Sequence, residues 1–129
     1  MEAVTFAGVL GAVIGSFLNQ KSKANDASAK ELARTAQTTA ETIATDNNGS
    51  YATVEPKTLA AIEPSIQIAA GGNNAFISAA TGTGTGYEVT ATAATTEDTF
   101  TIKNEGGVVT RTCVAKVTTN KGGCPTGNW

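Results

Sequence analysis

The sequence contains no histidine, only two cysteines and three prolines, and seven aromatic residues among its 129 positions. The absence of histidine excludes histidine-based catalytic triads, histidine-ligated zinc and the commonest general base at neutral pH. Charge is also scarce: 9 basic and 11 acidic residues give a net charge of −2, which is not the electrostatic pattern of a nucleic-acid-binding protein. We therefore expect a protein that is not an enzyme, with no catalytic residues, metal site or cofactor.

Small residues and threonine dominate what is present. Alanine and threonine occur 22 times each and glycine 14 times, while hydrophobic residues make up 40% of the chain, too many for a disordered composition. The length allows one domain with a modest core. This composition suits a secreted, structural or assembled protein better than a cytosolic enzyme.

The two cysteines, Cys113 and Cys124, lie near the C-terminus, and the second is surrounded by glycine at 122 and 123 and proline at 125. An even count in this setting favours a small disulfide loop, with two free thiols as the alternative. A zinc site would require further ligands, and the chain offers no histidine and no third cysteine. A disulfide in turn indicates an oxidising compartment outside the cytoplasm.

The N-terminal segment from Ala3 to Leu18 is uncharged, with Lys21 and Lys23 following it. As a helix it would span about 24 Å, slightly less than the hydrocarbon core of a bilayer. Three interpretations stay open: a cleaved signal peptide, a single-span anchor, or a helix that passes through the membrane and ends buried in a helical assembly.

A second helical pattern follows without a break from residue 19 to about 47, and Asn47-Asn48-Gly49 is a strong stop signal. One continuous helix of about 45 residues is the simplest interpretation. Its first third is apolar on all sides, and the remainder is apolar on one face only. That face, which we expect to pack on a sheet, is formed by Leu32, Ala36, Ala40 and Ile43 and widened by Ala29, Ala33 and Ala44.

The second half of the chain alternates between apolar and polar residues and is rich in turn signals. After one short helical turn within 56–64, we predict strands near 65–70, 86–94, 98–104 and 108–114. Their apolar face would comprise Ile66, Ile68, Val89, Phe100, Ile102 and Val109. The fold class is therefore α+β, with a long N-terminal helix packed on a three- to four-stranded antiparallel sheet.

These features together resemble bacterial type IV pilins, and most closely pilin-like proteins of the Gram-positive, actinobacterial type. The segment FLNQKSKANDASAKELARTAQTTAETIATDNNGSYA at 17–52 is similar to their helix after the membrane segment and to the first loop. GYEVTATA at 86–93, DTFTIKN at 98–104 and VTRTCVAKVTTNKGGCPTGNW at 109–129 are similar to their closing hairpins, disulfide loop and terminal tryptophan. The resemblance covers residues 17–129 and depends on the order of these parts.

The resemblance implies a type IV pilin-like fold in which residues 1–18 form the membrane and filament-core half of the helix and 19–129 form the globular domain. It implies a structural subunit of a helical homo-oligomeric filament at the cell surface, stored in the inner or cytoplasmic membrane before assembly with other pilins and the assembly machinery. In this family, a glutamate near the N-terminus is thought to pair with the terminal amine of a neighbouring subunit. The residues expected to mediate assembly are Glu2, Phe6, Val9, Leu10, Val13, Ile14 and Phe17.

Two alternatives to the pilin stay open. One is a pseudopilin of a type II secretion or competence machine, with the same fold; the other is a single-span membrane-anchored binding domain that acts alone. Lys116 and Lys121, in the predicted cysteine loop, could contact DNA, but the charge pattern does not indicate DNA as a partner.

Overall fold

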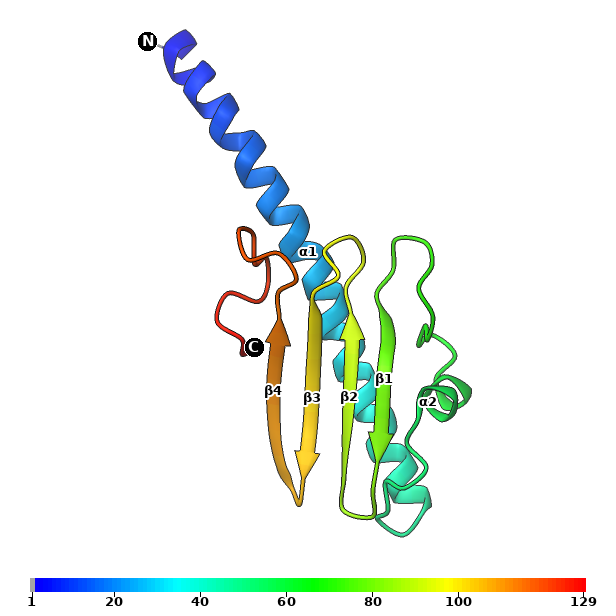
Figure 1. Ribbon diagram of the computed structural model, residues 1–129. Helices are drawn as coiled ribbons and strands as arrows, with labels where there is room; N and C mark the ends of the chain where they lie inside the picture. Colours follow the sequence, from blue (N-terminus) through cyan, green and yellow to red (C-terminus); the bar gives the residue numbers. More distant parts are fainter. Residues whose placement is uncertain (1) are drawn as a thin grey trace.

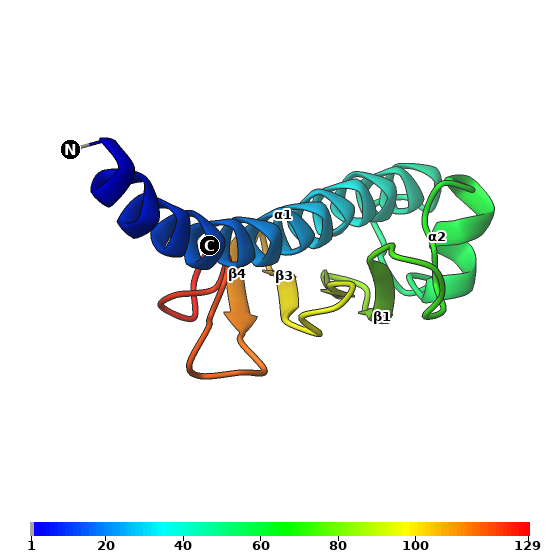
Figure 2. The same cartoon turned by 90° about the horizontal axis from the view of Figure 1, so that it is seen from above.

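The computed structural model describes the backbone of residues 2–129 and the side chains of residues 20–129. The fold is α+β and has two layers, a long helix and a four-stranded antiparallel sheet, with one short helix at the side (Figure 1). In the view along the sheet, α1 lies across one of its faces, and the N-terminal turns project beyond it (Figure 2). The elements in chain order are α1 (Glu2–Asp46), α2 (Pro56–Ile62), β1 (Phe76–Gly82), β2 (Gly86–Thr92), β3 (Thr99–Glu105) and β4 (Val108–Val114).

Helix α1 is continuous over 45 residues, which confirms the single helix that the sequence predicts. The helix ends at Asp46, directly before the predicted stop signal Asn47-Asn48-Gly49. Gly49 has a φ of +87°, and its N–H donates a hydrogen bond of 2.7 Å to the carbonyl of Ala44. This left-handed conformation closes the last turn and favours glycine, because it has no Cβ.

The sheet is a meander with the order β1-β2-β3-β4, so each strand pairs with its neighbour in the sequence. Three of the four predicted strands are confirmed as β2, β3 and β4. In the observed register, Ala91 of β2 lies opposite Phe100 of β3, which in turn lies opposite Cys113 of β4. The alternation of these strands therefore places one set of side chains toward α1 and the other toward solvent.

The first strand differs from its prediction. Residues 65–70 are not a strand; Ile66 is buried as part of a loop, whereas Ile68 is 37% exposed. The strand instead is β1, whose sequence FISAATG has a β-bulge after Ile77 and only one large residue buried against the helix. Alternation is weak in such a segment, because the bulge interrupts it and the only buried residues are Ile77 and the small Ala80. The predicted short helical turn is confirmed as α2, which buries Leu59.

The core lies between α1 and the sheet. Its largest fully buried side chains on the strands are Phe100, Ile102, Ile77 and Val89, and each contributes roughly 1.5–3 kcal/mol by burial. They face a stripe on α1 that consists mainly of small side chains, namely Ala29, Ala33, Ala36 and Ala40, together with Ile43. The alanines present little bulk and let the helix axis approach the sheet closely.

The predicted helix–sheet core is therefore largely confirmed, with two corrections. Ala36, Ala40 and Ile43 are buried, but Leu32 is only partly buried at the edge of the cluster, because the stripe is centred on the alanines. Val109, which we expected on the apolar face, is 46% exposed. Val109 lies near the beginning of β4, the edge strand. Among the described residues, α1 contacts β1, β2 and β3 but not β4, so the helix does not cover this side chain.

Candidate functional site

The residues expected to mediate assembly lie outside the described side chains. The backbone that carries them belongs to α1 and continues the helix beyond the sheet (Figure 1). Nothing in the structure tests their roles. They are Glu2, Phe6, Val9, Leu10, Val13, Ile14 and Phe17.

The C-terminal segment contains the predicted disulfide. Cys113 and Cys124 are joined, with a Cα–Cα distance of 5.9 Å, and both are nearly fully buried. We call the residues between them, 114–123, the disulfide loop. It lies beside α1 near the point where the helix leaves the sheet (Figure 1). The disulfide thus ties the end of β4 to a loop that contacts the helix.

The chain end returns to β4 and covers part of its edge. The indole N–H of Trp129 donates a hydrogen bond of 2.8 Å to the carbonyl of Thr112. Its ring meets Phe100 edge-on at a centroid distance of 5.8 Å, and the guanidinium groups of Arg34 and Arg111 lie 5.2 and 5.3 Å from its centroid. Such cation–π contacts contribute about 0.5–1 kcal/mol each at exposed sites. Trp129 therefore acts as a packing anchor between α1 and β4.

Asp26 on α1 is the first of two buried carboxyl groups at this end of the molecule, and its exposed fraction is 0%. Its Oδ1 accepts a hydrogen bond of 2.7 Å from the hydroxyl of Thr96, and its Oδ2 accepts one of 2.7 Å from the N–H of Gly123. The approach at Gly123 is close, because a Cβ there would lie 2.7 Å from the Cβ of Asp26. Only glycine fits at this position without displacing the disulfide loop from the helix.

Asp98, immediately before β3, is the second buried carboxyl, and its exposed fraction is 1%. Its Oδ1 accepts a hydrogen bond of 2.8 Å from the N–H of Lys116, while its Oδ2 has no hydrogen-bond partner among the described residues. Burial, aided by the neighbouring carboxyl group of Asp26, raises the pKa of Asp98 to about 6, and the N–H of Lys116 opposes this shift. We call Asp26 and Asp98 the carboxyl pair.

The carboxyl pair is absent from the sequence-based predictions, although one signal for it exists. The buried positions of α1 are spaced by three and four, and continuing this spacing toward the N-terminus from Ala29 leads to Asp26. A charged residue on the buried face of a helix is expected to form hydrogen bonds or ion pairs with other parts of the fold. Asp98 carries no such signal, because an aspartate after a turn is ordinarily solvated.

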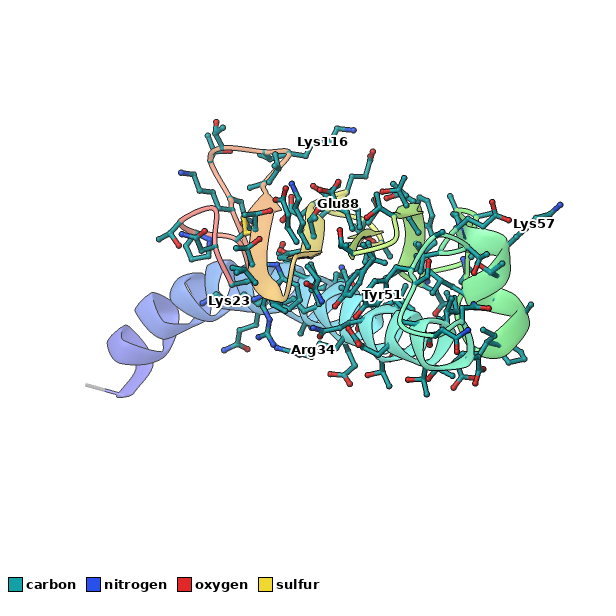
Figure 3. All side chains as sticks on the ribbon, turned by 90° about the horizontal axis from the view of Figure 1, so that it is seen from below. Lys23, Arg34, Tyr51, Lys57, Glu88 and Lys116 are labelled. Carbon is teal, nitrogen blue, oxygen red and sulfur yellow. A yellow bond between two sulfur atoms is a disulfide. The ribbon has the colours of Figure 1, made fainter. Side chains whose placement is uncertain are left out.

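The lysines of the disulfide loop are exposed. The ammonium group of Lys116 pairs with Glu97 at 2.6 Å, and both side chains are more than half exposed. In Figure 3 the side chain of Lys116 extends away from the ribbon, as does that of Lys57 at the other end of the molecule. Exposed pairs of this kind contribute little to stability. Nothing in the structure tests whether Lys116 or Lys121 contacts DNA.

Two features are absent from the part of the chain that the structure describes. No group of three or more His, Cys, Asp or Glu side chains could hold a metal ion there. Within the same residues, no helix combines the length and the apolar character that a membrane crossing requires.

Comparisons with known proteins find no match. No family model matches the chain, and no curated protein or solved structure is significantly similar to it. The function proposed below therefore rests on the sequence and the fold.

Proposed function

We propose that this protein is a type IV pilin-like structural subunit that assembles into a helical filament through its N-terminal helix. One observation carries the proposal: α1 is far longer than the sheet that covers it. A helix of 45 residues measures about 68 Å, whereas strands of 7 residues measure roughly 23 Å. The sheet can therefore cover only part of the length of α1.

The sequence of the uncovered part supports this proposal. The first buried residue that the structure describes on α1 is Asp26, and the uncharged run from Ala3 to Leu18 precedes it. An apolar helix needs lipid or other helices around it. The small residues Gly8, Gly11 and Gly15 would let neighbouring copies of α1 approach closely.

In this proposal the globular domain, residues 19–129, forms the filament surface, and the apolar helix half forms the filament centre. Before assembly the same helix half resides in the cytoplasmic or inner membrane. Glu2 pairs with the terminal amine of a neighbouring subunit, which offsets the cost of burying its charge and fixes the register between subunits. The partners are other copies of the chain, other pilins and the assembly machinery.

A photocrosslinking experiment tests the proposal. A photoreactive phenylalanine replaces Val13 in the full chain, which is expressed in a bacterium that assembles type IV filaments, and the sheared surface fraction is irradiated. We expect a ladder of homo-oligomers from position 13. The same substitution at Lys57, which is exposed on α2, serves as the control and should yield far fewer products.

The alternatives give different results in the same experiment. Homo-oligomers confined to the membrane fraction, with no surface filaments under the electron microscope, would favour a pseudopilin. Monomers alone from position 13 would contradict assembly through α1 and favour a single-span anchored binding domain.

A further inference from the structure

The carboxyl pair joins three segments that lie far apart in the sequence. Asp26 belongs to α1, Asp98 follows the turn between β2 and β3, and their hydrogen-bond donors include Lys116 and Gly123 at the two ends of the disulfide loop. Beyond Val114, which pairs with Thr99 in the sheet, the backbone N–H bonds from the loop to the rest of the described fold are those to these two carboxyls. The side chain of Asn120 adds a hydrogen bond of 3.2 Å to the hydroxyl of Ser22 on α1. The protonation of the pair therefore bears directly on the attachment of the loop.

One carboxyl oxygen of the pair has no hydrogen-bond donor among the described residues. Of the four carboxyl oxygens, three accept a hydrogen bond, from the hydroxyl of Thr96 and from the N–H groups of Gly123 and Lys116. The fourth, Oδ2 of Asp98, is buried without a partner among the described residues. Buried polar atoms are nearly always satisfied, and two adjacent carboxylates do not both ionise readily. A proton held between the two groups would supply the missing donor.

The charged groups around the pair do not replace this proton. Lys30 on α1 lies beside Gly123, and its ammonium group is placed over the ring of Phe100 at 5.5 Å. On the turn between β2 and β3, Glu97 pairs with Lys116 of the disulfide loop, and Lys121 of the same loop is exposed. Within the described residues, neither carboxyl of the pair forms a salt bridge.

A bound cation is a poorer occupant than a proton. Calcium takes six to eight oxygen ligands, and three of the four carboxyl oxygens already face N–H or O–H donors. A cavity of about 190 Å³ beside Asp98 is lined by this residue, Ser22 and Asn120, among others, while the Oδ2 atom of Asp98 itself is buried. The cavity is large enough for water, which gives the proton a path to solvent.

We propose that the carboxyl pair shares one proton and works as a pH-sensitive clasp that holds the disulfide loop on α1. With the proton in place, the four oxygens are satisfied and the loop is fastened. When the proton leaves, two negative charges face each other in a buried site, and the loop loosens. The clasp concerns the fold of the single chain and holds whether or not the protein forms filaments.

The direction of the pH effect follows from the pKa of Asp98, which rises from its ordinary 3.8 to about 6 in the folded protein. The folded state then keeps a proton that the unfolded chain has already lost. The stabilisation is complete below about pH 4 and disappears as the pH rises through 6.

An NMR titration of the full chain in mild detergent tests the clasp directly. The ¹³C signals of the aspartate carboxyls and the amide signals of Lys116 and Gly123 are followed from pH 3.5 to 8.5. We expect one carboxyl to titrate with a midpoint near 6 and both amide signals to move with the same midpoint. If every aspartate titrates near 4, or if the two amides stay fixed through pH 6, the proposal is wrong.

Two variants test the effect on stability. Between pH 4.5 and 7.5 we expect the Tm of the native chain to fall by about 5 °C more than that of Asp98→Asn, whose amide supplies a permanent donor. Glu97→Gln is the matched control, because it removes a neighbouring exposed charge, and it should keep the native pH dependence. A native slope in Asp98→Asn would contradict the clasp; if that variant does not fold, the NMR titration still decides.

A melting experiment with calcium distinguishes a shared proton from a bound cation. The native chain is melted at pH 7.5 with and without 1 mM calcium chloride. We expect no change in Tm. A rise of several degrees that is lost in Asp98→Asn would assign a cation to the free oxygen and overturn the proposal of a shared proton.

Discussion

The two ends of the contact between α1 and the sheet are held by different kinds of chemistry. At the end near α2, Ile43 is buried in the same apolar cluster as Leu59 and Val54. At the opposite end, the buried carboxyls of Asp26 and Asp98 receive hydrogen bonds from loops. Apolar burial is insensitive to pH and to oxidation, whereas the polar end depends on a proton and on a disulfide. We therefore expect the helix and sheet to stay packed over a range of conditions, whereas the attachment of the C-terminal segment varies with pH and with the state of the disulfide.

The largest effect is expected at the apolar end. Ile43→Asp should unfold the globular domain, because it places an unpaired charge at a position that is 2% exposed. The cost, above about 4 kcal/mol, approaches the total stability of a small domain. Circular dichroism should show no cooperative melting transition.

The control for this change is Ile62→Asp at the end of α2, where the side chain is 47% exposed. It should melt within a few degrees of the native chain. Native stability in Ile43→Asp would mean that the helix does not pack through this face.

Reduction of the disulfide should have the next largest effect. Cys113 and Cys124 are 11 positions apart, and opening a loop of this size costs roughly 3 kcal/mol in the chain-entropy model. The Tm should fall by several degrees under reductant, and amide exchange should rise in the disulfide loop more than around Ile43. The double variant Cys113→Ser/Cys124→Ser should not respond to reductant. An unchanged melt of the native chain would show that the disulfide adds no stability.

A smaller effect is expected from Gly123→Ala, which adds one methyl group at the contact with Asp26. The new Cβ would meet the Cβ of Asp26 at 2.7 Å, so the disulfide loop has to shift, at a cost of about 2 kcal/mol. Gly84→Ala in the hairpin between β1 and β2 is the control, since nothing lies within 4 Å of its Cβ. Equal melting temperatures for the two variants would argue against close contact between the loop and α1.

Much of the fold could be predicted from the sequence because its signals are local. The stop signal at Gly49, the alternation in β2 and β3 and the flanks of Cys124 each act within a few residues. The same dependence on local signals explains why β1 was not predicted: a bulge follows Ile77 and the next buried residue is the small Ala80, so the segment shows no regular alternation. Ile66 and Ile68 alternate more clearly, yet they belong to a loop.

The candidate site could not be predicted to the same extent, because it depends on contacts between distant residues. Asp26 and Gly123 are separated by 97 positions and meet only when the disulfide loop folds onto α1. No local sequence pattern predicts the contact between these two residues. The centring of the helix stripe on Ala33 rather than Leu32 has a related cause, since the close approach of the sheet favours the smaller side chain.

The meander order of the sheet has a consequence for the rate of folding. Each strand pairs with its neighbour in the chain, so the three hairpins can form one after another by closing short loops. The docking of α1 brings together residues that are more distant along the chain, such as those of α1 and β3. Rates of folding fall as contacts become less local. The slow step of folding should therefore be the arrival of the helix on a sheet whose hairpins have already formed.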